Sequence, residues 1–246
     1  LNKKLKVEKE DILFCLENTG VYSMPACYWM QNGQFDYWVV SALEIKRSKG
    51  IVRGKTDKAD SRDIALYAKS HLHELKLSIL PEKDFLEIRL LLAERDKVIK
   101  AISLFNMTNE NKNFLPKDVL KTTLQHNAKM IRFLKKQLLL IDASIEKLVQ
   151  SNPIFKQQDD LLQSIPGVGR QTSVLLIAYT QAFTLFKNHR QFACYAGVAP
   201  FEYSSGSSVR GRTKVSNLAN KKLKTALNMA ALTAKKFDSQ LKQYYE

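Results

Sequence analysis

Short apolar segments alternate with helical patterns near the start of the chain. Residues 11–16 (DILFCL) and 35–40 (FDYWVV) are short runs of apolar, aromatic and β-branched side chains, as is typical of buried strands. The turn sequence ENTG follows the first run, and helices are expected over residues 21–30 and 57–69. The order strand, helix, strand, helix predicts an α/β unit with a mostly parallel sheet.

A longer helical periodicity runs through the middle of the chain. Residues 82–105 are expected to form a helix with one apolar side, made of Phe85, Ile88, Leu92, Ile99 and Ile102. Apolar residues then recur at spacings of three and four over residues 124–148, with Asn127 as the one polar position of this seam. The pattern predicts a coiled coil, formed either with the helix 82–105 or with another subunit. An internal helix of a bundle is the alternative.

The last third changes character again. A Pro-Gly-Val-Gly turn at residues 166–169 has apolar residues on both sides, and residues 203–217 are rich in serine and glycine, which predicts a loop. A basic amphipathic helix is expected over residues 218–237. We therefore predict three parts, listed here: a partial α/β domain over 1–80, a helical coiled-coil linker over 81–155, and a mostly α-helical domain over 156–246.

The charge balance points to a polyanionic partner. Lys and Arg number 39 against 24 Asp and Glu, which gives a net charge of +15. The net charges of the three parts are +3, +4 and +8 in chain order, with the second division placed after residue 155. Phosphate backbones are the commonest partners of such a field, although a soluble basic protein without that role remains an alternative. The last third is the expected nucleic-acid surface.

The cysteines and the apolar runs exclude other classes. Cys15, Cys27 and Cys194 lie far apart and form no CxxC motif, which argues against a disulfide framework or a zinc ribbon and fits a reducing cytoplasm. No apolar run approaches the roughly 20 residues that a membrane span needs. The opening sequence LNKKLKVEKED lacks Met and resembles a helix already under way, so we expect a fragment of a longer chain.

Three carboxylates are candidate metal ligands. Asp57 and Asp60 are three residues apart and share one face of the expected helix, while Glu17 directly follows an expected strand. Carboxylate oxygens are the ligands that Mg²⁺ prefers, and two such ions can stabilise both the attacking and the leaving oxygen of a phosphodiester. Asp63 continues the spacing and could replace either aspartate. Helix capping is the simpler interpretation of the aspartates.

A second cluster combines hydroxyls with cations. Serines 204, 205, 207 and 208 surround Gly206, and Arg210, Arg212 and Lys214 follow. A serine hydroxyl can attack a phosphodiester when nearby cations neutralise the phosphate charge. A flexible surface loop is the alternative, because Ser and Gly build such loops routinely.

The glycine turn and the basic helix add candidate contacts to nucleic acid. Gly167 and Gly169 precede an expected helix that begins near Arg170, and free amides at such a helix start can hold a phosphate oxygen. The turn resembles the hairpin of helix-hairpin-helix modules, and it is equally compatible with a tight turn between helices. Lys221 and Lys222 provide cations on the basic helix.

The motifs occur together in an order that resembles a known family. The segments are ENTGVY from Glu17, KTDKADSRDIA from Lys55, IPGVG from Ile165 and YAGVAPFEYSSGSSVRGRTKVSN from Tyr195. They resemble the DEDD transposases of the insertion-sequence 110 family, which includes Piv-type DNA invertases and bridge-RNA-guided recombinases. The resemblance implies a RuvC-like, RNase H-type domain, then a coiled-coil segment and a C-terminal transposase domain with a helix-hairpin-helix-like motif.

The resemblance also implies residue roles. Glu17, Asp57 and Asp60 match three of the family's four acidic positions and would bind Mg²⁺. Ser205, directly before the glycine of the Ser-Gly motif, matches the nucleophile that would hold cleaved DNA as a phosphoserine ester. The family's first Asp lies in an initial strand of the type GIDVSK, and this sequence has no such segment.

These observations predict a DNA transposase or site-specific recombinase, guided by RNA and located in the cytoplasm near the nucleoid. The resemblance implies DNA and guide-RNA partners, and the coiled-coil pattern favours a homodimer or tetramer. Two alternatives stay open: a non-catalytic DNA- or RNA-binding module, and a RuvC-like metal-dependent nuclease that uses water.

Overall fold

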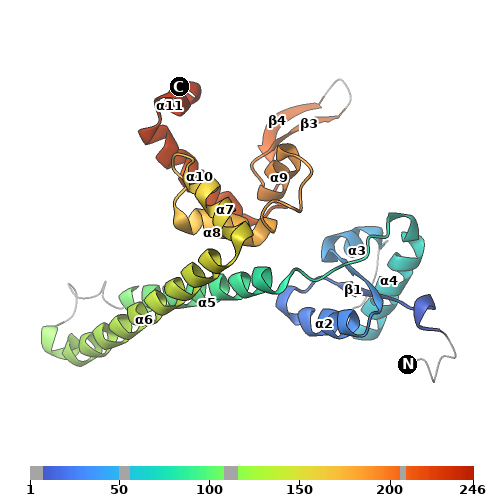
Figure 1. The fold of residues 1–246 in the computed structure, drawn as a ribbon, viewed down its shortest axis with the longest axis horizontal. Helices are drawn as coiled ribbons and strands as arrows, with labels where there is room; N and C mark the ends of the chain where they lie inside the picture. Colours follow the sequence, from blue (N-terminus) through green and yellow to red (C-terminus); the bar gives the residue numbers. More distant parts are fainter. Residues whose placement is uncertain (1–7, 50–55, 108–115, 206–208) are drawn as a thin grey trace. The chain divides into compact units, whose positions relative to one another are not determined.

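The computed structural model describes residues 8–49, 56–107, 116–205 and 209–246 (Figure 1). The chain is mostly helical and divides into two compact units, Leu1–Pro81 and Glu82–Glu246. No helix in the described ranges is both long enough and apolar enough to span a bilayer. The two units are described separately below.

A parallel pair of strands lies at the centre of the first unit. Strand β1 (Leu13–Glu17) pairs with β2 (Asp36–Val40) in parallel, so that Glu17 lies opposite Val40. Helix α2 (Met24–Asn32) makes the crossover between the strands, as parallel pairing requires. The predicted parallel strand–helix–strand order is therefore confirmed.

Helices cover both faces of this sheet. Leu13 and Cys15 pack into a cluster with Trp38 and with residues of α3 (Ala42–Ser48) and α4 (Asp57–Ser70). Phe14 and Leu16 pack on the opposite face, in a cluster that includes Cys27 and Met30 of α2. Successive side chains of a strand point to opposite faces, which explains the division. Burial on both faces is the reason why β1 is an uninterrupted apolar run.

Two local features differ from the sequence-based expectation. The helix expected from residue 21 begins at Met24, because Gly20–Tyr22 forms a short 3₁₀ turn and Pro25 suits a helix start. Helix α3 was not expected within its polar sequence. The Ser41 hydroxyl accepts a hydrogen bond from the Leu43 amide at its start, and Ile45 is its buried anchor. Short 3₁₀ segments also occur at Lys9–Asp11 and Leu72–Glu74.

The second unit contains helices that pack around a common apolar core, and one β-hairpin whose described residues lie outside that core. Phe155 of α7 and Ile177 of α8 are fully buried in this core, with Val149 of α6 and Leu223 of α10. The elements of this unit are α5 (Lys83–Met107), α6 (Lys117–Ser151), α7 (Pro153–Gln163), α8 (Arg170–Thr180), α9 (His189–Ala196), β3 (Pro200–Ser205), β4 (Val209–Val215), α10 (Lys221–Phe237) and α11 (Ser239–Tyr245).

Helices α5 and α6 form an antiparallel hairpin. The Asn152 amide donates to Asp84 at 2.7 Å near the base, and Arg95 donates to Asp142 at 2.7 Å further along. Asn127, which is 7% exposed, lies at the far end, within 3.5 Å of a backbone oxygen of α5. The predicted seam therefore pairs with the helix of its own chain. Ile99 was expected on the buried side but is 39% exposed, because the inward side of α5 there runs through Val98 and Ile102.

The serine-rich segment was predicted as a loop, and this prediction was wrong for most of its length. Strands β3 and β4 form an antiparallel hairpin, with Phe201 opposite Lys214 and a register shift between Phe201 and Tyr203. Strand β3 carries the aromatic residues Phe201 and Tyr203, and β4 carries the β-branched residues Val209, Thr213 and Val215, which favours pairing over a loop. Residues 206–208, with Gly206, Ser207 and Ser208, lie outside the described residues.

Candidate catalytic and nucleic-acid-binding residues

Glu17 is the last residue of β1, at the carboxyl end of the parallel pair. The Asn18 amide donates to the Val40 carbonyl at 2.8 Å, which fixes the chain directly after Glu17. By the alternation of the strand, Glu17 shares the face of Leu13 and Cys15, which α4 covers. The carboxyl ends of parallel strands are a common place for functional side chains, and Glu17 is half-buried there.

Asp57 and Asp60 lie in the first turn of α4. The Thr56 hydroxyl accepts a hydrogen bond from the Ala59 amide at 3.2 Å and thereby caps the helix. Carboxylates in a first turn also interact favourably with the helix dipole. Asp57 is exposed, while Asp60 is half-buried. Capping falls to Thr56, so that helix initiation does not require the side chain of either aspartate.

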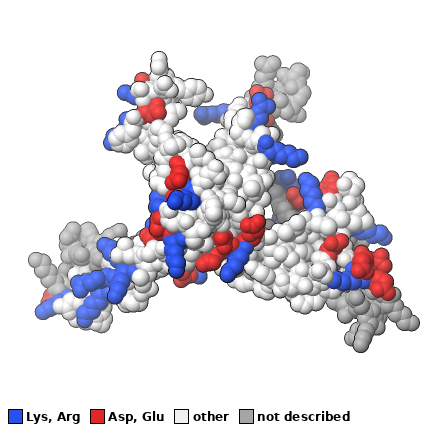
Figure 2. All heavy atoms as spheres, in the orientation of Figure 1, with Lys and Arg blue, Asp and Glu red and all other residues white. Residues whose placement is uncertain are grey.

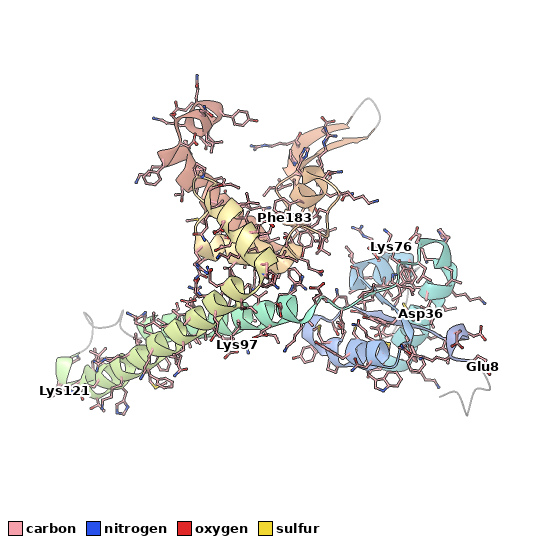
Figure 3. The ribbon with its side chains drawn as sticks, in the orientation of Figure 1. Glu8, Asp36, Lys76, Lys97, Lys121 and Phe183 are labelled. Atoms are coloured by element: carbon pink, nitrogen blue, oxygen red, sulfur yellow. The ribbon has the colours of Figure 1, made fainter. Side chains whose placement is uncertain are left out.

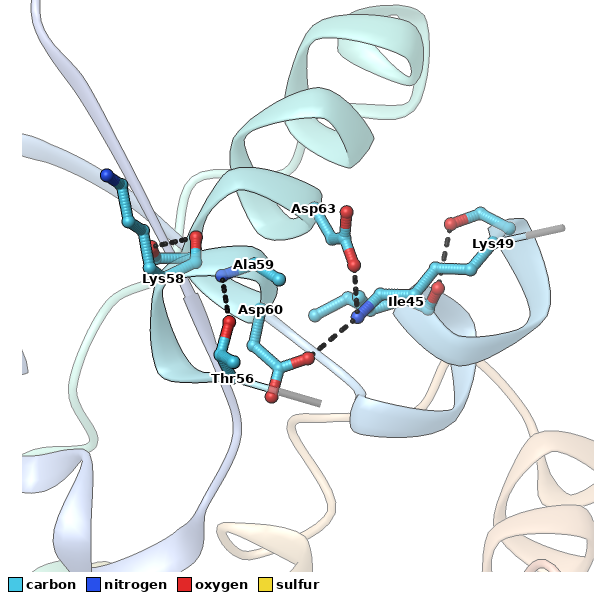
Figure 4. Close-up of polar contacts among 9 residues, drawn as sticks. Ile45, Lys49, Thr56, Lys58, Ala59, Asp60 and Asp63 are labelled. Carbon is cyan, nitrogen blue, oxygen red and sulfur yellow. Dashed lines mark hydrogen bonds and ion pairs between the residues drawn. The ribbon is translucent and has the colours of Figure 1, made fainter. Parts of the chain in front are cut away.

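Lys49 joins two carboxylates of α4 (Figure 4). Its ammonium lies 2.9 Å from Asp63 Oδ2 and 3.3 Å from Asp60 Oδ1. The hydrogen bond to Asp63 raises the pKa of Lys49 above its ordinary value, and Asp60 adds to this effect. The structure therefore brings Asp60 together with Asp63 around one positive charge. The sequence analysis missed Lys49 because it lies outside the spaced acidic motif.

The acidic residues were tested for their fit to a divalent cation. Among the described residues, no three His, Cys, Asp or Glu side chains converge closely enough to hold a metal ion. The side chains nevertheless supply hard oxygen donors, which Mg²⁺ prefers. The Lys49 ammonium lies between two of them, where a cation held by two carboxylates would lie. The donor chemistry of these carboxylates therefore suits a divalent cation, while the described side chains do not converge on one site.

Ser205 ends strand β3. In the hairpin register Ser204 lies opposite Arg210, and Ser205 lies opposite Val209. The side chains of Ser204, Ser205 and Arg210 lie outside the described residues. The backbone therefore brings the serine pair to the end of a β-ribbon, next to the first cation of the basic strand.

The glycine turn between α7 and α8 packs against α10. Gly167 has a φ of +87°, and a Cβ there would lie 2.2 Å from the Ala230 carbonyl oxygen. Only glycine fits this close approach without a shift of the backbone. Gly169 precedes α8, has open space around its Cβ position, and has an ordinary negative φ. Glycine is therefore required at position 167 by packing within the protein, while the helix start at Gly169 has free space beside it.

Arg170, predicted to contact nucleic acid, forms ion pairs within the unit. Its guanidinium contacts Glu146 of α6 and lies 3.8 Å from Asp159 of α7. Asp159 is 2% exposed and accepts hydrogen bonds from Ser173 at 2.6 Å and from Gln163 at 2.8 Å. A buried carboxylate needs such partners. Arg170 therefore also helps to join α6, α7 and α8.

Lys222 is likewise paired. Its ammonium contacts Asp96 of α5 and lies 5.8 Å from the centre of the Tyr179 ring. Burial lowers the pKa of Lys222, but Asp96 and Tyr179 outweigh this effect and raise it above its ordinary value. Lys222 thus stays charged and connects α10 to α5.

The remaining predicted cations are open to solvent. Arg212 and Lys214 are exposed on β4, and Lys221 is exposed at the start of α10. Across the described ranges none of the three forms an ion pair. Among the predicted cations whose side chains the structure describes, these three are available to a polyanion.

Two family models match different parts of the chain. One, described as "Transposase IS116/IS110/IS902 family", matches residues 159–246, and one for the DEDD transposases of IS110, described as "Transposase", matches residues 1–117. The chain carries both transposase domains of the IS110 family. The serine hairpin and the glycine turn thus lie in one transposase domain, and the carboxylates lie in the other. A DEDD transposase domain implies the use of a divalent metal ion.

Three relatives agree with this assignment. The pilin gene-inverting proteins of Moraxella lacunata and Moraxella bovis are each 27% identical over 229 residues, or 88% of this chain. The chain spans 65% of the length of each. An IS110 element protein of Streptomyces coelicolor is 31% identical over 106 residues, which are 43% of this chain and 25% of that protein.

Proposed function

We propose that the protein is a DNA transposase or site-specific recombinase that cleaves and rejoins DNA through Ser205. The observation that supports this most strongly is the presence of both IS110-family transposase domains in one chain. The pilin gene-inverting relatives, aligned over 88% of the chain, are named for the inversion of a gene. The first unit would be a partial RuvC-like domain.

The acidic residues would prepare the scissile phosphate. Glu17, Asp57 and Asp60 are the residues that would hold Mg²⁺, which neutralises charge on the phosphate oxygens. Asp57 is exposed and capping is left to Thr56, so this carboxylate is available for a ligand. In the metal-free protein Lys49 would hold Asp60 beside Asp63, because it contacts both carboxylates.

Ser205 would act as the nucleophile. Its oxygen would form a bond to phosphorus, its proton would pass to a nearby base, and the bond to the leaving strand oxygen would break. The departing strand takes up a proton and becomes a free hydroxyl. Attack of such a hydroxyl on the phosphoserine restores the phosphodiester and the serine. The number of ester bonds is conserved, so rejoining needs no ATP.

The second unit would bind the DNA backbone. Arg212 and Lys214 extend along β4 next to the serine hairpin, and Lys221 is exposed at the start of α10. The open helix start after Gly169 would offer amides to a phosphate, as in a helix-hairpin-helix module. Gly167, Arg170 and Lys222 would support this surface from within the unit.

Sequence choice would rest on a guide RNA. In such a system base pairing selects the target, while the protein reads backbone and shape. Removal of RNA from the purified protein would then abolish site selection but not backbone binding. Binding at the same DNA site after complete RNA digestion would contradict guidance.

The exposed side of α6 supports self-association. Val119, Met130, Phe133 and Leu140 are 64%, 40%, 55% and 54% exposed, and their spacings of 11, 3 and 7 fit a second heptad seam. We name these four residues the apolar flank. A second copy of the chain would cover it in a dimer or tetramer that joins two DNA sites.

The metal assignment is tested by substitutions in the natural full-length protein. Asp57→Asn and Asp60→Asn each remove a ligand charge, so DNA cleavage in Mg²⁺ should fall by about 100-fold or more, as expected for loss of a few kcal/mol of transition-state stabilisation. Asp36→Asn, which changes an exposed carboxylate at the other end of the parallel strand pair, is the control and should retain most activity. Cleavage that is unaffected at Asp57 and Asp60, or by chelation of Mg²⁺, would contradict the assignment.

One observation favours a non-catalytic nucleic-acid-binding module as the second candidate. Asp60 is already paired with Lys49, and the described residues contain no converged metal cluster. Such a module would bind DNA with strong salt dependence and without any response to Mg²⁺. Cleavage by the natural full-length protein excludes this candidate.

A further inference from the structure

One side of α6 is lined with cations. Lys121, Lys129, Arg132, Lys135 and Lys136 are all exposed, and we name these five residues the basic flank. With about 100° per residue, they fall within an arc of about 120° on one side of the buried seam. The apolar flank lies on the other side. Figure 2 shows Lys and Arg gathered on this hairpin, and Figure 3 marks it at Lys97 and Lys121.

These cations lack acidic partners, unlike those near the base of the hairpin. There, Arg95 pairs with Asp142 and Arg170 pairs with Glu146. Within the described ranges no member of the basic flank forms an ion pair. Asp118 is the one acidic residue of α6 before Asp142. The described residues of the unit therefore provide no ion pair that neutralises the charge of the basic flank.

The spacing of the cations opposes helix stability. Lys129 and Arg132 are three residues apart, and Arg132 and Lys136 are four apart. Like charges at these spacings face each other on a helix and destabilise it. A bound polyanion would remove this repulsion.

We propose that the basic flank binds the phosphate backbone of duplex DNA, as a contact surface additional to that of the transposase domain. The flank extends about 22 Å along α6, since 15 residues rise about 1.5 Å each. The arc between its cations holds no aromatic side chain on which an unpaired base could stack, which favours a duplex over a single strand. The choice of DNA over RNA rests on the proposed recombinase function.

The test uses the salt dependence of DNA affinity, because its slope reports the number of phosphates that the protein contacts. The variant Lys129→Gln/Arg132→Gln/Lys136→Gln removes three charges and keeps side-chain length. Affinity for a short duplex of arbitrary sequence is measured by fluorescence anisotropy between about 50 and 200 mM KCl. Each lost contact reduces the slope of log affinity against log salt by about 0.9. The wild type should therefore lose about 40-fold more affinity than the variant over this range.

A matched control separates the flank from general charge. Lys46→Gln/Lys69→Gln/Lys83→Gln removes three exposed cations elsewhere and should leave the slope nearly unchanged. Circular dichroism checks that both variants retain their helices. An equal change of slope in both variants, or no change in either, overturns the proposal. A loss confined to duplex RNA overturns the choice of DNA.

The outcome is independent of catalysis, because the probe need not be cleaved. A basic flank that binds duplex DNA in a protein that never cleaves DNA would support this inference and refute the recombinase proposal. If the protein cleaves DNA while the flank variant keeps the wild-type salt slope, the recombinase proposal is supported and this inference is refuted.

Discussion

Lys49 is the cation that pairs with two carboxylates of α4. Its ammonium contacts both Asp60 and Asp63, so two carboxylates one turn apart lie at close range. A divalent ion that binds Asp60 has to compete with this contact. Lys49 would therefore stabilise the metal-free protein and weaken its affinity for the metal.

The variant Lys49→Met tests this competition. Without metal it should unfold at a lower temperature than the wild type, because Asp60 and Asp63 then repel each other. Mg²⁺ should raise its melting temperature more than that of the wild type, since the competing charge is gone. Thermal shifts over a Mg²⁺ series measure both effects. Lys46→Met, an exposed change in α3, the helix that Lys49 directly follows, is the control. A variant with the wild-type response to Mg²⁺ would disprove competition.

Gly167 should be required for folding rather than for DNA contact alone. Gly167→Ala places a Cβ 2.2 Å from the Ala230 carbonyl at a φ of +87°. Strain and overpacking together should lower the free energy of unfolding by about 2–4 kcal/mol. Gly169→Ala has open space and should cost less than about 1 kcal/mol. Urea unfolding gives both values, and equal effects would contradict the packing argument.

At this scale the sequence predicts residue types better than partners. The spacing of Asp57 and Asp60 correctly predicted that they share one helix. The apolar run before Glu17 correctly predicted its place at the end of a strand. Which cations are free depends on distant acidic residues: Asp96 for Lys222 and Glu146 for Arg170. No local pattern contains that information. Spacing therefore left Arg170 and Lys222 indistinguishable from Arg212 and Lys214.

Among the elements, those with long or simple patterns were predicted and those set by tertiary contact were not. The two apolar runs form parallel strands, and the three-and-four spacing of α6 forms the face that packs on α5. Helix α3 is short and polar, so its one buried anchor, Ile45, gave no periodicity. The β3–β4 hairpin was not predicted, because its segment is rich in serine and glycine, which are typical of loops. Its strands become regular only through their pairing with each other.

Asn127 is the polar position within the seam of α6. It is 7% exposed, and among the described residues its amide donates one long hydrogen bond, at 3.5 Å, to the Phe105 carbonyl. A weak hydrogen bond compensates poorly for the burial of an amide. Asn127→Leu should therefore raise the free energy of unfolding by about 1 kcal/mol.

The same urea measurement includes a control in the seam. Leu134→Ala removes a half-buried apolar contact and should lower stability, by about 1–3 kcal/mol. A loss of stability in Asn127→Leu would show that the amide contact is net favourable. Such a result would also favour a role for Asn127 in fixing the register of the hairpin.

At the scale of the whole molecule, α6 presents three different sides. The seam packs on α5, the basic flank is proposed to bind DNA, and the apolar flank is proposed to bind a second copy. Periodicity in the sequence indicated the first side only, because exposed residues on a helix follow the same spacing as buried ones. The structure shows which apolar residues of α6 face α5 and which stay exposed.

The apolar flank leads to a prediction about assembly. Phe133→Glu/Leu140→Glu places charges in the proposed subunit contact and should convert an oligomer to a monomer in light scattering. Leu139→Glu is the control, since Leu139 is 70% exposed and lies on the side of the basic flank, outside the apolar flank. A monomeric wild-type protein at high concentration, or equal dissociation by the control, would contradict this interface.

The central claim is that DNA becomes covalently attached to Ser205. The decisive measurement combines the natural full-length protein, Mg²⁺, its element DNA and any co-transcribed RNA, followed by a denaturing gel. We predict a protein–DNA adduct that disappears in Ser205→Ala and survives in Ser204→Ala. Cleavage without any adduct, or an adduct that persists in Ser205→Ala, would contradict the account. The first of these outcomes would instead indicate a metal-dependent nuclease that uses water.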